Sequence, residues 1–180
     1  MGSVLDKLAG GDLRSIGRAD EVAQDVLQDP RLFDEVFRGM QSEDPVIRMR
    51  AADVIEKVAR RRPEYLQPYK DKLIGEIAAI DQQEVRWHVA LMLSCLSLSD
   101  EEKEQAAELL VSWLKNSKSR IVKVNALETL AHFAETDPHY ADKVTELLSE
   151  AAGSGSPAMA ARARKLLARL QKKKQYPPKG

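Results

Sequence analysis

The sequence has little of what disulfide-stapled, zinc-bound or membrane-spanning proteins need. Its 180 residues include one cysteine, which excludes a disulfide framework and a cysteine-rich zinc module. The longest apolar segment, residues 89–98, is interrupted by serines and falls short of the roughly 20 residues of a membrane span. The N-terminus shows no basic region followed by an apolar one. We therefore expect a cytoplasmic protein without a membrane span.

Aromatic residues are also scarce, at 5% of the chain, whereas hydrophobic residues make up 43% and charged residues 31%. This hydrophobic content is too high for a disordered chain. The abundance of Ala, Leu, Glu, Lys and Arg favours helices over strands. The length suits one domain or one short array of repeats.

The charges balance in total but not along the chain. There are 28 basic and 28 acidic residues, and the last acidic one is Glu150, so residues 1–150 carry a net charge of −8 and residues 151–180 carry +8. Most of the late basic residues form a predicted basic patch near the end of the chain: Arg164, Lys165, Arg169, Lys172, Lys173 and Lys174. Such a patch either binds an acidic partner or nucleic acid, or it is a solubilising terminal cap.

Four segments of the chain align with one another at spacings of 38, 37 and 37 residues. Each has an apolar residue, then in three of the four a basic one, then small or apolar residues three and four positions later, and an aliphatic residue three beyond those. The segments are residues 44–55, 82–93, 119–130 and 156–167. Internal repeats of this period are typical of proteins built from stacked helical units.

Each repeat is predicted to be a helical hairpin. Apolar residues of the aligned segments recur with helical period, and Asp44-Pro45 and Ser156-Pro157 supply a cap followed by proline. A further helix precedes each segment; the one before the second segment is expected over about residues 67–80, and Ser99 begins a capping box for the next. The predicted organisation is a single domain over residues 1–174 with a flexible tail at 175–180. It comprises a capping helix at 15–28 and hairpins at about 29–62, 63–98, 99–136 and 137–172.

The shared frame, Asp-x-x-Val/Ile-Arg-x-x-Ala-x-x-x-Leu/Ile, resembles the HEAT repeat of the HEAT/armadillo class. The match is best at residues 44–55 and 84–93, and the fourth copy lacks both the Asp and the basic residue, as expected of a terminal cap. The resemblance implies an all-α fold, a right-handed α–α superhelix of about four hairpins whose second helices line a concave surface. It implies a surface for binding and no particular reaction.

A basic residue recurs at one position of the frame, as Arg48, Arg86 and Lys123. The resemblance favours a structural ladder between repeats, in which these cations pair with carbonyls or with helix-start acids such as Asp44 and Asp81. The alternative is a basic stripe that binds phosphate.

Two residues further on, the aligned positions hold chemically different residues and are therefore predicted to face solvent. The residues that follow this position along the same helix face are charged in three copies and mostly apolar in the second copy, where Trp87 lies beside them. An apolar stripe between charged ones predicts a binding hot spot for a protein partner. The expected contacts are Trp87, His88, Leu91 and Asn125, with Arg50 and Arg162 at the rim. Packing of Trp87 and Leu91 under neighbouring helices is the alternative.

No set of residues predicts catalysis, a metal or a cofactor. Cys95 and His132 occupy equivalent positions of adjacent repeats, but no third orienting group accompanies them. The three histidines do not share a helix face at ligand spacing. The sequence thus predicts a non-enzymatic scaffold that binds a protein partner on the concave face. Nucleic-acid binding through the basic C-terminal repeat is the second hypothesis, and a HEAT-like DNA-repair or lyase accessory protein is the third.

Overall fold

The computed structural model describes residues 2–175, with side chains up to residue 173. This part of the chain is helical and contains no strand, which confirms the all-α prediction. The helices form two compact units, Met1–Lys103 and Glu104–Gly180, and each is considered by itself. Most of the predicted tail, residues 176–180, lies outside the described residues. None of the described helices combines the length and apolar character that a membrane crossing needs.

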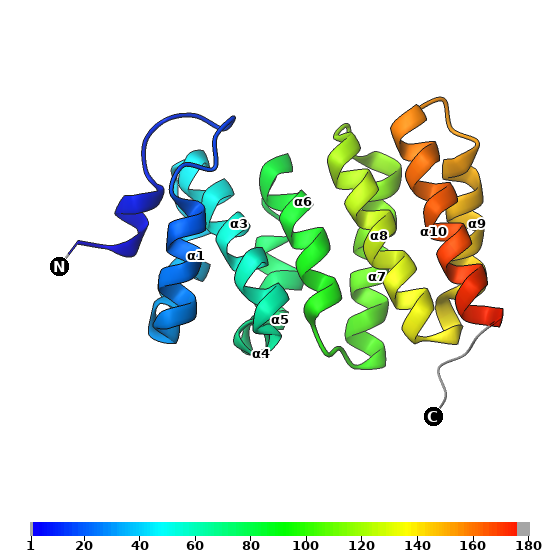
Figure 1. Ribbon diagram of the computed structural model, residues 1–180, viewed down its shortest axis with the longest axis horizontal. Coiled ribbons are helices and arrows are strands. Elements are labelled where there is room, and N and C mark those ends of the chain that lie inside the picture. Colours follow the sequence, from blue (N-terminus) through cyan, green and yellow to red (C-terminus); the bar gives the residue numbers. More distant parts are fainter. Residues whose placement is uncertain (1, 176–180) are drawn as a thin grey trace. The chain divides into compact units, whose positions relative to one another are not determined.

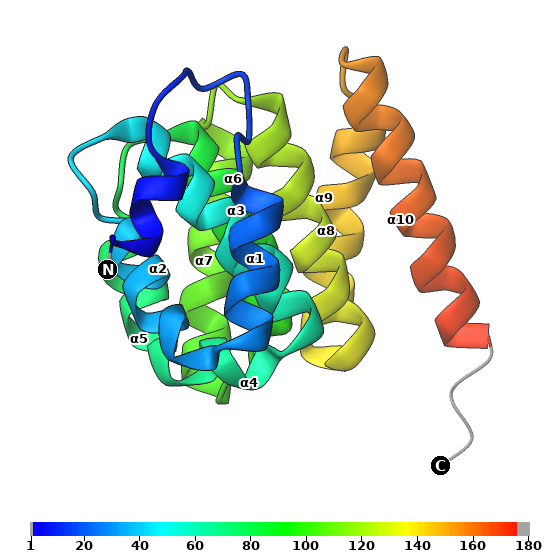
Figure 2. The same cartoon turned by 60° about the vertical axis from the view of Figure 1, so that its left-hand side comes forward.

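In the first unit, α3 packs against α1, α2 and α6 (Figures 1 and 2). The α-helices of this unit are α1 (Ala19–Gln28), α2 (Phe33–Gly39), α3 (Pro45–Arg61), α4 (Pro63–Leu66), α5 (Lys70–Lys72) and α6 (Gln83–Met92). Shorter turns connect them: η1 (Val4–Leu8), η2 (Pro30–Leu32), η3 (Gln67–Tyr69), η4 (Leu73–Ile77) and η5 (Leu93–Cys95). Small and branched side chains such as Ala51, Ala52 and Ile55 are fully buried on α3, which lets the neighbouring helices approach closely.

Two elements of the first unit differ from the predictions. The helix expected over 67–80 begins earlier, at Pro63, and is broken into α4, η3, α5 and the π-helical turn η4. Pro68 lies inside this stretch and has no amide hydrogen to donate, which accounts for the 3-10 turn η3 between α4 and α5. The capping helix expected from residue 15 starts at Ala19, because the preceding residues form a loop in which Gly10, Gly11 and Gly17 have positive φ.

The second unit contains α8 (Arg120–Thr136), the turn η6 (Pro138–Tyr140), α9 (Ala141–Ala152) and α10 (Pro157–Gln175). These three helices pack on one another. The preceding helix, α7 (Asp100–Asn116), begins in the last residues of the first unit and continues into the second. The predicted capping box is present at its start, since the Ser99 amide donates to Glu102 Oε2 at 2.8 Å and the Glu102 amide donates to Ser99 Oγ at 3.3 Å.

Taken in chain order, the helices can be grouped as consecutive pairs over the ranges of the predicted hairpins, and the hairpin organisation itself stays a prediction. The pairs are α2 with α3, α4–η4 with α6, α7 with α8, and α9 with α10. Aspartate followed by proline opens several elements as predicted: Asp44 accepts a hydrogen bond from the Val46 amide at 2.8 Å, and Asp137 accepts one from the His139 amide at 3.0 Å. The superhelical stacking of the pairs stays a prediction.

Candidate functional site

A pocket of about 280 Å³ in the first unit brings together part of the predicted binding surface and a segment that the sequence did not single out. We call it the Trp87 pocket. Helix α3 contributes Met49 and Asp53, helix α6 contributes Trp87 and His88, and the loop before α1 contributes Leu13, Arg14, Ser15 and Ile16. Both helices are the second members of their pairs, so the pocket lies on the helices that were expected to bind a partner.

The loop wall of the pocket is apolar and exposed. Leu13 and Ile16 are 39% and 43% exposed, and the only other large hydrophobic side chain so exposed among the described residues is Ile121, in the second unit. Such residues are costly to leave in water. Their convergence with the half-buried Trp87 makes an apolar concavity with a few polar groups, the usual composition of a binding pocket.

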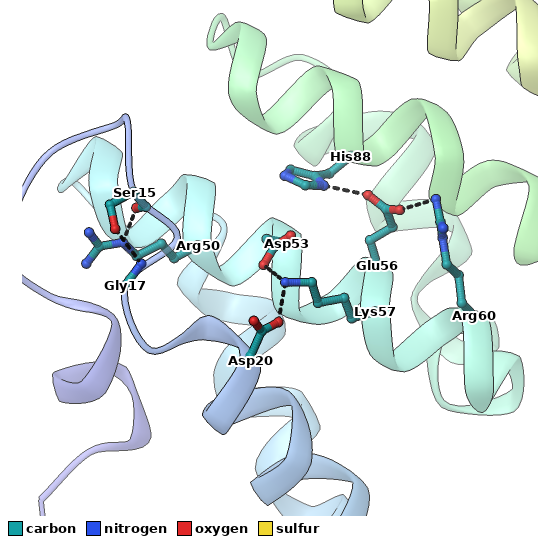
Figure 3. A network of polar contacts seen from close by, with 9 residues as sticks. All are labelled: Ser15, Gly17, Asp20, Arg50, Asp53, Glu56, Lys57, Arg60 and His88. Carbon is teal, nitrogen blue, oxygen red and sulfur yellow. Dashed lines mark hydrogen bonds and ion pairs between the residues drawn. The ribbon is translucent and has the colours of Figure 1, made fainter.

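Arg50 of α3 holds this loop in place. Its guanidinium donates hydrogen bonds to the main-chain carbonyls of Leu8 (2.9 Å), Ala9 (3.3 Å), Gly10 (2.7 Å), Asp12 (3.4 Å) and Ser15 (3.0 Å). A planar group with five donors suits this arrangement, because the loop wraps around it. Figure 3 shows the guanidinium next to Ser15 and Gly17.

Glycine at position 17 is required by the same contact. Gly17 has a φ of +54°, and a Cβ atom built there would lie 2.7 Å from the Arg50 guanidinium carbon. Both the backbone conformation and the close approach make a side chain costly at this position. The Ser15 hydroxyl accepts a hydrogen bond from the Gly17 amide at 3.1 Å, which fixes the last turn before α1.

Below the loop, Lys57 of α3 joins α1 to α3. Its ammonium group donates to Asp20 of α1 and to Asp53 of α3, each at 2.6 Å (Figure 3). Burial by itself would lower the pKa of Lys57, but the hydrogen bonds with Asp20 and Asp53 outweigh it and the pKa is raised. Lys57 therefore stays charged, and it compensates the charge of Asp53, which is buried beside the pocket.

A second polar contact joins α3 to α6. The buried carboxylate of Glu56 lies 2.5 Å from His88 Nδ1 and 2.5 Å from an Arg60 guanidinium nitrogen (Figure 3). A buried carboxylate needs such partners to offset the cost of desolvation. His88 is oriented by this contact, and it lines the Trp87 pocket from a fixed position.

The predicted partner-binding residues have different outcomes. Trp87 and His88 both line the Trp87 pocket. Leu91 is half-buried and does not line it. The prediction that Arg50 faces solvent at the rim is wrong: its side chain is buried because the N-terminal loop covers it. Asn125 is half-buried and Arg162 exposed in the second unit, outside this pocket.

The loop residues of the pocket were missed because the sequence places them in a short segment without a repeat. The Gly10-Gly11 pair was the one local signal of an unusual backbone there. Apolar residues at positions 13 and 16 are also visible in the sequence, but single exposed apolar residues are common on protein surfaces, so only their convergence with Trp87 in the structure marks a pocket.

Among the cations of the predicted ladder, Arg48 reaches the next pair, whereas Arg86 bonds to Asp81 just before its own helix. Arg48 donates to Gln82 Oε1 of the next pair at 2.7 Å and to the Ser42 carbonyl at 2.7 Å, and Arg86 pairs with Asp81 at 3.0 Å. Asp44 does not pair with Arg48, because its carboxylate caps α3 instead. For Lys123, the described residues include no ion-pair partner. These contacts occupy Arg48 and Arg86 structurally, which disfavours a phosphate stripe.

The basic patch on α10 is partly neutralised by α8. Arg162 lies 3.1 Å from Glu128, Arg169 pairs with Glu128 and Glu135, and Lys173 lies 3.7 Å from Glu135. Carboxylates of α8 therefore oppose the charges of Arg162, Arg169 and Lys173. Arg164, Lys165 and Lys172 remain exposed, and the Lys174 side chain lies outside the described residues.

The described part of the chain contains no cluster of three or more His, Cys, Asp or Glu residues that could hold a metal ion. Burial raises the pKa of the Cys95 thiol and lowers the pKa of His132. Both residues thus favour their neutral forms, whereas a nucleophilic pair needs a thiolate and an imidazolium.

Comparison of the chain with protein-family models, curated proteins and solved structures finds no match. The HEAT resemblance stays a prediction from the repeat frame.

Proposed function

We propose that this protein is a non-enzymatic, HEAT-like interaction module that binds a protein partner by receiving one of its apolar side chains in the Trp87 pocket. The observation that carries this proposal is the convergence of Leu13 and Ile16 with Trp87 around a preformed space. Interface energy is concentrated in such places, where an apolar anchor from one partner fills a pocket of the other and displaces water.

The rigidity of the pocket supports the proposal. Arg50 fastens the loop wall through five carbonyls, and Glu56 fixes His88 from the side of α3. A pocket that is already formed needs little ordering when a ligand binds, so more of the contact energy appears as affinity.

The decisive experiment compares two isoleucines. Ile16→Asp places a charge in the pocket wall, and Ile121→Asp places the same charge on a somewhat more exposed isoleucine of the second unit. Tagged full-length wild-type protein and both variants are used to capture partners from the source cell, followed by quantitative mass spectrometry. A true partner is retained by wild type and Ile121→Asp and falls roughly 30-fold with Ile16→Asp, the equivalent of a hot-spot loss of about 2 kcal/mol. Trp87→Ala should give the same loss.

Two results would contradict the proposal. One is a set of partners whose capture survives both Ile16→Asp and Trp87→Ala. The other is an equal loss with Ile16→Asp and Ile121→Asp, which would indicate a general effect of added charge.

The exposed side chains Arg164, Lys165 and Lys172 support a second candidate, nucleic-acid binding through α10. This function predicts an affinity that falls steeply with salt and is weakened by Arg164→Glu with Lys165→Glu. Absence of binding to single-stranded and duplex nucleic acid at low salt would exclude it.

A further inference from the structure

A second pocket of about 280 Å³ lies on the first helices of two successive pairs and shares no lining residue with the Trp87 pocket. We call it the aromatic groove. The first pair contributes Pro30, Arg31, Phe33 and Asp34, and the second pair contributes Glu64, Tyr65, Pro68 and Tyr69. All of these residues belong to the first unit.

The groove gathers much of the scarce aromatic content of the chain. The sequence holds nine aromatic residues, as three Phe, four Tyr and two Trp, and four of them meet here. The Phe33 ring centroid lies 5.9 Å from that of Tyr65 and 5.5 Å from that of Tyr69, and the Phe37 and Tyr69 centroids are 4.4 Å apart. Aromatic pairs at these distances attract one another, so the cluster is stable without a ligand.

Packing of α2 against α4 explains the two buried phenylalanines of this cluster and leaves its two tyrosines unexplained. Phe33 and Phe37 are 4% and 1% exposed, whereas Tyr65 and Tyr69 are half-buried and border an open space. A helix contact that served packing alone would be filled to the density of a protein interior. A cavity of roughly 150 Å³ is enough to hold one benzene ring, so the groove has room for nearly two rings.

The walls of the groove are held in position. The Tyr69 hydroxyl donates to Asp34 Oδ1 at 3.1 Å, and burial together with this hydrogen bond raises the pKa of Tyr69, which stays protonated. The Arg62 guanidinium lies 4.8 Å from the Tyr65 ring centroid and 2.5 Å from Glu64. The tyrosine faces are therefore presented with little freedom to lose on binding.

Rigid grooves of aromatic rings and prolines are suited to proline-rich segments in the polyproline II conformation, whose flat apolar rings stack on aromatic faces. The lining holds the carboxylates of Asp34 and Glu64 and the guanidinium of Arg31. Arg38 and Arg62 pair with the two carboxylates, so the preference for a segment with a basic residue comes from the net negative charge of the first unit as a whole.

We propose that the aromatic groove binds the segment Tyr176-Pro177-Pro178-Lys179 of a second copy of this chain. Pro177 and Pro178 are the only adjacent prolines in the sequence, and a lysine follows them. Residues 172–180 hold four lysines and no acidic residue, whereas residues 1–103 hold 20 acidic and 15 basic residues. The segment lies outside the described residues, and its charge is complementary to that of the unit that carries the groove.

Binding of the segment is tested with a fluorescently labelled peptide of residues 172–180. The receptor is the full-length protein with Pro177→Ser and Pro178→Ser, so that its own segment does not compete. The peptide should bind by fluorescence anisotropy, and a peptide with both prolines replaced by alanine should bind about tenfold more weakly or worse, a difference of about 1.4 kcal/mol. Glu64→Lys in the receptor should weaken binding, whereas the matched control Glu43→Lys, at an exposed position outside the groove, should not.

The second copy is tested by sedimentation of the wild-type chain over a wide concentration range. The weight-average mass should rise above the 20.1 kDa of one chain as concentration increases, and the Pro177→Ser/Pro178→Ser variant should stay at the mass of one chain. Three results would overturn the proposal: no peptide binding, equal binding of the alanine peptide, or a wild-type mass that does not change with concentration. The last result together with peptide binding would mean that the segment docks within its own chain.

Discussion

Replacement of Arg50 by methionine removes the guanidinium whose hydrogen bonds fasten the N-terminal loop to α3. The Arg50 side chain is 3% exposed and donates five hydrogen bonds, all to main-chain carbonyls. No carboxylate in the described part of the chain pairs with it. Methionine keeps the apolar stem of the side chain but has no donor to offer, so the change isolates the role of the guanidinium.

The cost can be bounded from these contacts. A hydrogen bond to a charged group contributes about 1.5–3 kcal/mol, and a buried acceptor left without a partner costs about 1–3 kcal/mol. The values do not add, because the loop carbonyls can turn to water once the cation is gone, and because the desolvation cost of the buried cation is also removed. We expect a loss of about 3 kcal/mol in the free energy of unfolding, a large part of the typical total of about 5–15 kcal/mol.

Urea denaturation measures this loss, and hydrogen exchange detected by mass spectrometry locates it. Exchange should accelerate most in residues 8–18, with a smaller change in the centre of α3. Arg38→Met is the matched control, because Arg38 pairs with Asp34 on the surface with its side chain 67% exposed, and such pairs contribute about 0–1 kcal/mol. An Arg50→Met variant with the wild-type urea midpoint and wild-type exchange in the loop would refute the assignment. An Arg50→Lys variant with wild-type stability would show that a positive charge is enough to hold the loop and that the planar geometry of the guanidinium is not needed.

Three further predictions follow from single residues. Gly17→Ala should lower the free energy of unfolding by about 1–3 kcal/mol, because Gly17 has a φ of +54° and the new Cβ would lie 2.7 Å from the guanidinium carbon of Arg50. Gly75→Ala should not lower it, because a Cβ there would meet nothing within 4 Å. Equal effects of the two substitutions in urea denaturation would contradict the argument. The hydrogen bond from Arg18 is the largest cause that lowers the pKa of Glu21 from 4.5 to about 2. The stabilisation of the fold by this carboxylate is therefore present above pH 4.5 and is lost as the pH falls toward 2. An NMR titration midpoint of Glu21 near 4.5 would be incompatible with this pH dependence. Burial raises the pKa of Cys95, so iodoacetamide at pH 8 should alkylate it much more slowly in the folded protein than in urea, and equal rates would show an accessible thiolate.

Helices and their boundaries were predictable because the signals are local. Asp44 and Asp137 precede prolines that begin helical turns, and Ser99 begins a capping box; each acts within four residues of itself. The 3-10 turn at Gln67–Tyr69 was predictable in principle from Pro68, because a proline inside a helix removes a backbone donor. Local patterns thus define the helix pairs, and they say little about contacts between distant segments.

The contacts of Arg50 could not be predicted for a different reason. Its acceptors are backbone carbonyls, which every residue has, so no residue type in the loop marks the partner of the guanidinium. Repeat alignment predicted that this position faces solvent, but His88 and Asn125 at the aligned positions are themselves half-buried. The first repeat has no preceding pair, and the chain before α1 covers that position instead.

Charged residues on α3 determine where the apolar residues of the Trp87 pocket lie. Charged residues on one helix face are expected to face solvent, yet Arg50 and Lys57 on α3 bind the loop and α1. These contacts hold the loop in the position where Leu13 and Ile16 line the pocket together with Trp87. It follows that Arg50, which does not line the pocket, should control partner binding through the loop. Arg50→Met should therefore weaken the capture of any partner that Ile16→Asp also loses. It should do so although Leu13 and Ile16 themselves are not substituted. A partner that binds Arg50→Met at wild-type strength would show that Trp87 and its neighbours on α6 recognise it without the loop.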